Sequence, residues 1–385
     1  MSILLSDIYH DTARTYQLSL VAGADGLQNV MSWVYITEDI ENTGFLSGGE
    51  LIITTGICAK NDPSWILSFA KEMHEAGACG LVINIGKYIT NLPEELITFC
   101  ETNRFPLFTL PWAVHLHSIS RDYYERLFIE RQSRLEVSTI ISELLNNHRV
   151  KENVLTLEKH HFASDDEYVV TTVAVSEIKF SSSQLLFIFE NAIASFRIKC
   201  HCQLHKNDII LIFKGENMER ITEFIFHLEN HMNLYSSGKF YIGIGSKVKL
   251  DSLAKSFFHS SAAILMAKTL DKKHISYEEL GFYRILFSST DKGSFEKFID
   301  EQLGKIILYD EKHNSNYLLT LRSYLFNGGS LKAMTEELFC HRNTINYRVN
   351  VLKETFNLEL DDAICRFHLM AAFYIRDFLG IINTK

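Results

Sequence analysis

The segment Tyr317–Phe356, YLLTLRSYLFNGGSLKAMTEELFCHRNTINYRVNVLKETF, decides how the C-terminal part of this chain folds. Leucines at helical spacing predict a first helix over residues 317–326. Asn327-Gly328-Gly329 predicts its end, because glycine adopts the left-handed C-cap conformation readily. Ser330 is a favourable N-cap for a second helix over 331–339. After a turn at Cys340-His341, we expect a third helix from Arg342 to about Phe356.

The third helix has two unlike faces. Its apolar residues are spaced four, three and four apart and form one inward stripe: Ile345, Val349, Leu352 and Phe356. The opposite face carries arginine, asparagine and tyrosine, and no acid occurs between His341 and Lys353. Arginine pairs with guanine and asparagine with adenine in the major groove. The segment 317–358 therefore predicts a DNA-binding helix-turn-helix near the C-terminus. The alternative is an ordinary helical bundle that serves as a scaffold for protein contact.

Overall charge does not decide between these alternatives. The chain has 385 residues, 46% of them hydrophobic, and a formal net charge of −9. This length allows two or three domains, each with its own core. DNA binders need a positive contact face, but only that face has to be positive.

We expect a cytoplasmic protein without an export signal or a membrane anchor. Asp7, His10 and Asp11 lie where a signal peptide needs apolar residues. The longest uncharged apolar stretch, residues 76–86, is too short to span a bilayer. Seven cysteines without a regular framework fit a reducing compartment.

The region before residue 112 alternates strand and helix patterns and contains all four prolines. Apolar strands are predicted at 50–55, 80–84 and 106–110, and helices open at Pro63 and Pro93. This order predicts an α/β domain over residues 1–112 with a partly parallel sheet.

Polar residues around the first of these strands are candidate ligand contacts. Glycines permit close approach of the backbone to a ligand, and ligands sit beyond the carboxyl ends of parallel strands. We expect a small polar metabolite at a site drawn from Glu38, Gly48, Gly49, Glu50, Thr54 and Thr55. The alternative is that the glycines only shape turns and the threonines only satisfy nearby backbone groups.

Three further regions follow. Residues 113–160 predict a helical connector, with one long helix or two joined helices over 114–148. These residues lack a regular heptad of apolar residues, so no coiled coil is predicted. The connector is a candidate dimer contact or a solvated linker. Residues 161–287 predict an α+β domain with strands at 168–175, 208–213 and 240–245 and helices at 185–198, 221–232 and 253–270. Residues 294–385 are expected to be all helical, after a polar break at 288–293.

The motifs Asn327-Gly-Gly-Ser-Leu-Lys-Ala333 and Cys340-His-Arg-Asn-Thr-Ile-Asn-Tyr-Arg348 resemble the C-terminal helix-turn-helix of the PucR/CdaR family of bacterial transcription regulators. The family's N-terminal sensory domain is resembled by three segments: Val21–Gly26, Trp33–Glu38 and Gly48–Gly56. Its GGDEF-like central domain is resembled by two more, Gly243-Ile-Gly245 and Tyr277–Gly281. Cys340 stands where the family usually has an aliphatic residue, and we interpret it as buried packing, with a redox switch as the alternative.

This resemblance implies a metabolite-responsive regulator of purine or amino-acid catabolism that binds double-stranded DNA as a homodimer or higher homo-oligomer. The implied DNA contacts are Arg342, Asn343, Thr344, Asn346, Tyr347 and Arg348.

An enzyme is the competing interpretation of the central region. Diguanylate cyclases carry a Gly-Gly-Asp/Glu-Glu-Phe hairpin. Its place is taken here by His205–Ile209. This segment has neither glycine, and Asp208 is its one acidic residue. We therefore expect a degenerate domain, no catalytic residue and no cofactor. Cys200-His201-Cys202 lacks the C-x(2–4)-C spacing of structural zinc sites, so a strand with buried thiols is favoured over metal binding.

Overall fold

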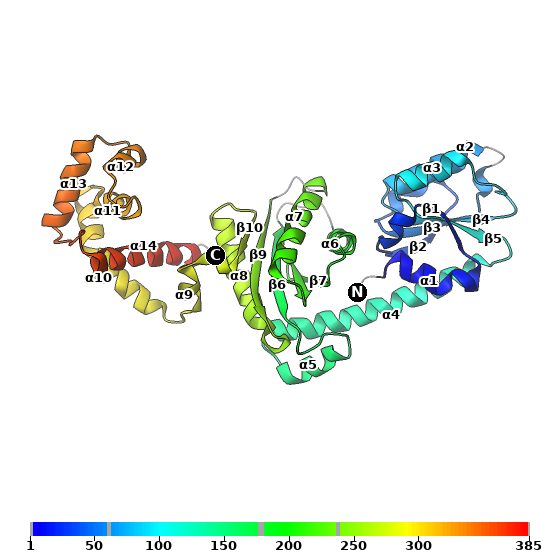
Figure 1. Ribbon diagram of the computed structural model, residues 1–385, viewed down its shortest axis with the longest axis horizontal. Helices are drawn as coiled ribbons and strands as arrows, with labels where there is room; N and C mark the ends of the chain where they lie inside the picture. Colours follow the sequence, from blue (N-terminus) through cyan, green and yellow to red (C-terminus); the bar gives the residue numbers. More distant parts are fainter. Residues whose placement is uncertain (1–2, 60–62, 176–180, 236–238, 384–385) are drawn as a thin grey trace. The chain divides into compact units, whose positions relative to one another are not determined.

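The computed structural model describes residues 3–59, 63–175, 181–235 and 239–383 of the chain (Figure 1). These form two compact units, Met1–Ile264 and Leu265–Lys385. Within the described ranges, no helix is both long enough and apolar enough to cross a lipid bilayer.

The first unit begins with a five-stranded sheet in the order β1-β5-β4-β3-β2. Neighbouring strands from β2 to β5 are parallel, and β1 is antiparallel to β5, which confirms the predicted partly parallel sheet. The strands are β1 Ser19–Ala22, β2 Trp33–Ile36, β3 Glu50–Thr54, β4 Gly80–Ile85 and β5 Leu107–Pro111. β3, β4 and β5 match the predicted strands within one residue, whereas β1 and β2 were not predicted.

Helices cover both faces of this sheet (Figure 1). α2 (Pro63–Glu75) and α3 (Glu94–Thr102) cover one face, and α1 (Leu5–Tyr16) with the start of α4 (Leu116–Leu145) covers the other. Successive residues of β3 point to opposite faces, so Leu51 and Ile53 join the α1/α4 core while Ile52 joins the α2/α3 core.

A single helix of 30 residues, α4, fills the region where one or two helices were predicted. It ends at Leu145, three residues earlier than expected, and α5 (Val150–Glu158) follows. Ile119 and Tyr123 of α4 belong to the first core, whereas Val137 and Ile141 belong to a second core. One helix therefore contributes to two separate cores.

A second five-stranded sheet has the order β10-β9-β6-β8-β7. Its strands are β6 Tyr168–Val175, β7 Cys200–His205, β8 Asp208–Lys214, β9 Phe240–Val248 and β10 His274–Ser276, and its helices are α6 Ser182–Phe196, α7 Met218–Tyr235 and α8 Leu253–Thr269. β6 pairs antiparallel with β8 and β9, and β7 with β8. The order β6-α6-β7-β8-α7-β9 with these pairings is ferredoxin-like. The GGDEF-like assignment stays a prediction.

From Tyr283 onward, the described residues of the second unit form helices joined by short connections. They are α9 Tyr283–Ser288, α10 Lys292–His313, α11 Tyr317–Phe326, α12 Leu331–Leu338, α13 Arg342–Glu354 and α14 Ala363–Asn383. Short 3-10 helices occur in both units: η1 Ala24–Gln28, η2 Ile40–Phe45, η3 Ile57–Ala59 and η4 Leu250–Ser252 in the first, and η5 Tyr277–Leu280 in the second. The three predicted C-terminal helices are confirmed within two residues at every end.

Candidate nucleic-acid interface

The amino end of α11 is fixed by a carboxylate from the preceding helix. The side chain of Asp310 in α10 accepts hydrogen bonds from the backbone N–H groups of Tyr317 at 2.9 Å and Leu318 at 2.8 Å, and from Ser315 Oγ at 2.6 Å. These are N–H groups that the first turn of a helix cannot pair internally. Asp310 thereby sets where the three-helix segment begins.

The turn between α11 and α12 has the predicted caps. Gly328 and Gly329 both have positive φ, and the N–H of Gly329 donates to the carbonyl of Tyr324 at 2.8 Å. Ser330 Oγ accepts from the N–H of Ala333 at 3.4 Å. A Cβ added at Gly329 would lie 3.3 Å from the Tyr324 ring, so this position favours glycine both by conformation and by space.

A polar contact holds α12 against α11. One carboxylate oxygen of Glu337 accepts hydrogen bonds from Ser323 Oγ and from Asn327 Nδ2, each at 2.5 Å. Ser323 is buried, so its hydroxyl needs this partner. This contact was not predicted from the sequence, because Ser323 and Asn327 lie 14 and 10 residues from Glu337.

His341 begins α13. Its Nδ1 accepts from the N–H of Asn343 at 3.3 Å, which makes it the N-cap of the helix. The preceding turn holds Phe339 at a φ of 49°, and the Phe339 side chain is 94% exposed. Cys340 is partly buried against the helical core, in line with its interpretation as a packing residue.

The predicted inward stripe of α13 is confirmed. Ile345, Val349 and Leu352 are buried, and Phe356 packs against the same cluster from just beyond the helix end. The cluster also contains Met334 of α12 and residues of α10, α11 and α14. Burial of these side chains fixes which way the rest of α13 faces.

All six residues implied as DNA contacts lie on α13, outside its buried stripe. Arg342, Asn343, Thr344 and Tyr347 are exposed, and Asn346 and Arg348 are half-buried. Within the described residues, no intramolecular hydrogen bond or ion pair engages these six side chains. The apolar stripe of α13 is buried, and the arginine and asparagine side chains outside it make no hydrogen bond or ion pair within the described residues. Their donors and acceptors are therefore available to an external partner.

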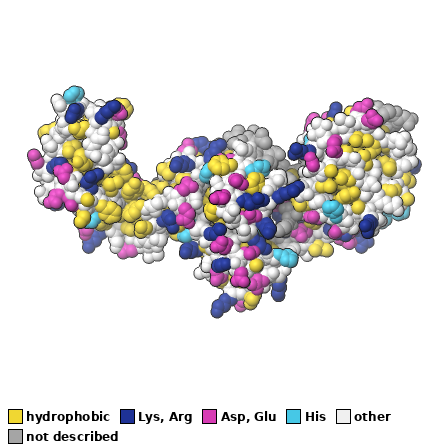
Figure 2. All heavy atoms as spheres, viewed as in Figure 1, with side chains coloured by type: hydrophobic (Ala, Val, Ile, Leu, Met, Phe, Trp, Pro, Cys, Tyr) yellow, Lys and Arg dark blue, Asp and Glu magenta, His cyan; other side chains and the backbone are white. Residues whose placement is uncertain are grey.

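Two ion pairs flank the three helices. Arg322 of α11 donates from both terminal nitrogens to Asp377 of α14, at 3.1 and 2.8 Å. Lys353 at the end of α13 lies 2.8 Å from the carboxylate of Asp361. In the space-filling view, cationic and anionic side chains are interspersed rather than gathered into one large basic surface (Figure 2).

The residues predicted as ligand contacts lie at both ends of β3. Glu38 lies at its carboxyl end and accepts from Thr54 Oγ1 at 2.8 Å and Thr55 Oγ1 at 2.6 Å. The N–H groups of Thr55, Gly56 and Ile57 also donate to Glu38, at 2.7, 3.0 and 3.2 Å. The two predicted threonine hydroxyls are therefore already bonded to a carboxylate of the same chain.

The other three predicted residues lie at the amino end of β3. Glu50 is buried and accepts from the N–H groups of Ser47 at 2.7 Å and Gly48 at 2.9 Å. Gly48 and Gly49 both have positive φ in this turn. A five-residue strand separates the two groups by about 13 Å. The structure therefore does not bring all six residues into one site.

The segment Cys200-His201-Cys202 lies in β7, as the strand interpretation expects. Burial raises the pKa of both thiols and lowers the pKa of His201 to about 4. His201 Nε2 lies 3.1 Å from Gln203 Oε1. Lys206 and Asn207 form the two-residue turn of the β7–β8 hairpin. This turn lies within His205–Ile209, the segment that takes the place of the cyclase motif.

Helices α11, α12 and α13 thus form a helix-turn-helix domain, with α13 in the place of the recognition helix. Residues 317–375 match the family described as "PucR C-terminal helix-turn-helix domain". Residues 7–127 match the "Purine catabolism regulatory protein-like family". The chain therefore carries the N-terminal PucR domain and the PucR C-terminal helix-turn-helix domain.

Two curated relatives come from Bacillus subtilis (strain 168). The chain is 34% identical over 146 residues to the "Proline-responsive transcriptional activator PutR", which covers 37% of this chain and 36% of the relative. It is 25% identical over 130 residues to the "Purine catabolism regulatory protein", and this match covers 34% of this chain and 24% of the relative. These matches span only about a quarter to a third of the relatives' length.

Among solved structures, the chain is similar to the "Regulator of Polyketide Synthase Expression" from Bifidobacterium adolescentis. The identity is 18%, with coverage of 62% of this chain and 95% of that one, and the TM-score is 0.29. A TM-score this low supports no conclusion about a shared arrangement.

Proposed function

We propose that this protein is a cytoplasmic transcription regulator that binds double-stranded DNA by placing α13 in the major groove. The observation that carries the proposal is the polar surface of α13 outside its buried stripe. Within the described residues, the side chains of two arginines and two asparagines on this surface make no hydrogen bond or ion pair. Arg342 and Asn346 are four residues apart and therefore on one side of the helix. The PucR C-terminal domain match supports the same function.

Base recognition by Arg342 and Asn346 is tested by DNA affinity. Arg342→Ala or Asn346→Ala should weaken binding to the specific site by about 1–3 kcal/mol and weaken binding to random DNA much less. Footprinting on the DNA flanking the gene would first locate the site, and fluorescence anisotropy at several salt concentrations would then measure affinity.

Arg376→Ala is the matched control, because Arg376 is an exposed arginine on α14, outside the helix-turn-helix. It should leave specific affinity unchanged. An equal loss on specific and random DNA would make Arg342 a phosphate contact, and unchanged binding by both α13 variants would remove α13 from the groove and favour the protein scaffold.

We further propose that the N-terminal α/β domain binds a small effector near the carboxyl end of β3. The Glu38 cluster gathers three backbone N–H groups and two hydroxyls at this edge, where ligands of parallel sheets bind. The names of the relatives make L-proline and purines the first effectors to test, by their influence on DNA affinity of the full chain. We assign no catalytic role to the central domain.

A further inference from the structure

The outer face of α4 carries a continuous exposed stripe. Its residues follow one another at spacings of three, four, three and four, and all are exposed: Glu125, Phe128, Gln132, Leu135 and Thr139. Phe128 and Leu135 are each 61% exposed, and the adjacent Ile129 is 67% exposed. Alternating spacings of three and four are those of the seam of a two-stranded coiled coil. Only every second position of this seam is apolar, namely Phe128 and Leu135, which is why the sequence shows no regular heptad of apolar residues.

The opposite face of α4 is already occupied by its own chain. Ile119, Tyr123 and Leu127 pack into the N-terminal core, and Val137 and Ile141 pack into the central core. At about 100° per residue, these buried positions lie roughly opposite the stripe along the whole helix. The stripe therefore stays outside both cores.

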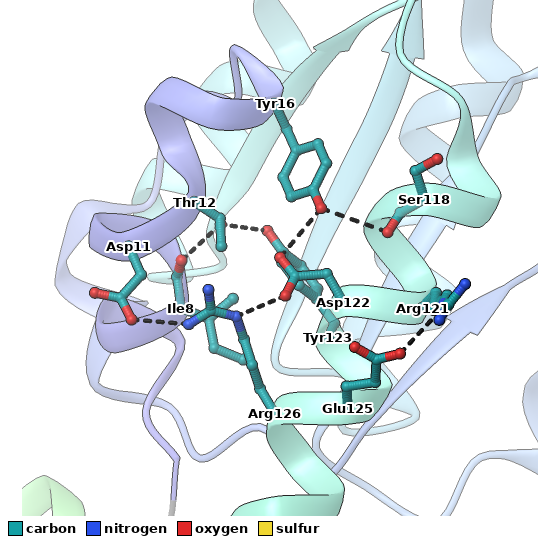
Figure 3. A network of polar contacts seen from close by, with 10 residues as sticks. All are labelled: Ile8, Asp11, Thr12, Tyr16, Ser118, Arg121, Asp122, Tyr123, Glu125 and Arg126. Atoms are coloured by element: carbon teal, nitrogen blue, oxygen red, sulfur yellow. Dashed lines mark hydrogen bonds and ion pairs between the residues drawn. The ribbon is translucent and has the colours of Figure 1, made fainter.

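Polar contacts with α1 hold this orientation (Figure 3). The hydroxyls of Tyr123 and Thr12 are 2.8 Å apart, and Tyr16 donates to Asp122 at 3.1 Å. Arg126 bonds Asp122 within α4 and Asp11 of α1, each at 2.9 Å. Turning α4 to bury the stripe would break these contacts.

A helix that only links two domains through solvent is expected to be polar on all sides. Exposing three large apolar side chains within eight residues costs solubility unless another surface covers them. The flanks of the stripe indicate which surface that is. Arg131 lies on one flank and Glu136 on the other, five residues later, and both are exposed.

We propose that this stripe binds the same stripe of a second copy of the chain as a parallel coiled coil. In parallel pairs, flanking residues five positions apart meet across the seam, so Arg131 of each copy pairs with Glu136 of the other. An antiparallel pair with Phe128 opposite Leu135 would instead bring the two copies of Arg131 together. In the parallel pair the two Glu125 side chains meet, but each of them is paired with Arg121 of its own helix at 2.8 Å. Glu136 also lies 3.6 Å from His160 Nε2 of its own chain, on the same flank. The inference deepens the proposed function by naming the surface that joins two DNA-binding domains.

Charge reversal tests the pairing without DNA. Sedimentation of the full chain should show a dimer, and Arg131→Glu or Glu136→Arg alone should weaken dimerisation on the order of tenfold, because each creates two like-charge contacts. The double variant R131E/E136R restores opposite charges and should restore dimerisation. Leu155→Ser is the control, since it removes an exposed leucine from α5, outside the stripe.

Cross-linking tests the direction of the two helices. In a parallel pair, Thr139→Cys faces its own copy and should form an intermolecular disulfide, whereas in the antiparallel pair the two sites lie about 22 Å apart. The experiment uses a Cys58→Ser background, because Cys58 is an exposed native thiol, with Lys151→Cys on α5 as the control. A monomeric wild-type chain, a double variant as weak as the single ones, or equal cross-linking at both cysteines would overturn the proposal. DNA binding by α13 is measured separately, so either idea can fail alone.

Discussion

At the scale of single residues, Glu38 shows how an expected ligand contact can be part of the fold. Five donors surround its carboxylate, two of them the hydroxyls of Thr54 and Thr55. Successive backbone N–H groups in a turn form a concave site for an anion, and here that anion belongs to the chain itself. An effector with its own carboxylate would compete with Glu38 for these donors.

Thr55→Val tests the structural part of this arrangement. Valine keeps the shape of threonine but removes the donor 2.6 Å from Glu38 Oε1. We expect the free energy of unfolding to fall by about 1–2 kcal/mol, because a hydrogen bond to a charged group is lost while four donors remain. Urea denaturation of the full chain, followed by tryptophan fluorescence of the N-terminal domain, measures the change.

Thr156→Val provides the comparison. Thr156 is half-buried on α5, and within the described residues its hydroxyl donates to the carbonyl of Glu152, one turn earlier. Its stability should change by less than about 0.5 kcal/mol. Equal stability of the wild type and Thr55→Val would mean that the Glu38 cluster does not stabilise the fold.

At the scale of elements, β7 carries a histidine that responds to acid. Burial lowers the pKa of His201 to about 4, below its ordinary value of 6.5. The unfolded chain therefore binds a proton at a higher pH than the folded chain. The contribution of His201 to stability is complete above about pH 6.5 and is lost as the pH falls toward 4, by roughly 1–3 kcal/mol.

His201→Gln should flatten that part of the stability profile, because glutamine does not titrate. Chemical denaturation between pH 4 and 7 gives the slope for each variant. His313→Gln is the control, since His313 is an exposed histidine at the end of α10. The explanation fails if the His201→Gln slope between pH 6.5 and 4 equals that of the wild type.

Local signals predicted the elements that local forces decide. The glycine pair after α11, the Ser330 cap and the inward stripe of α13 all act within a few residues, and the structure has each of them. β1 and β2 were missed because each has four residues and is only partly buried. The Glu337 and Glu38 contacts join residues 10 to 19 positions apart, and no periodicity encodes such pairings.

At the scale of the whole molecule, a dimer should read two half-sites. In the proposed complex each α13 would cover only a few base pairs, so paired helices should bind half-sites about one helical turn apart, or a multiple of that distance. Hydroxyl-radical footprinting should therefore show two protected segments with that separation on the specific DNA.

Changing the spacer between the half-sites tests this expectation. Adding about 5 base pairs puts the half-sites on opposite sides of the duplex and should abolish simultaneous binding, whereas adding about 10 returns them to the same side. Affinity that is the same for all three spacers would show that one domain binds alone.

The continuous helix α4 also has a consequence for the history of this chain. Because α4 belongs to two cores, inserting one residue between Leu127 and Val137 would turn one core by about 100° around the helix axis relative to the other. Insertions or deletions of about seven or eleven residues nearly preserve the phase. We therefore expect descendants and relatives that keep this helix to differ in its length by such steps, and single-residue changes in length to be eliminated by selection.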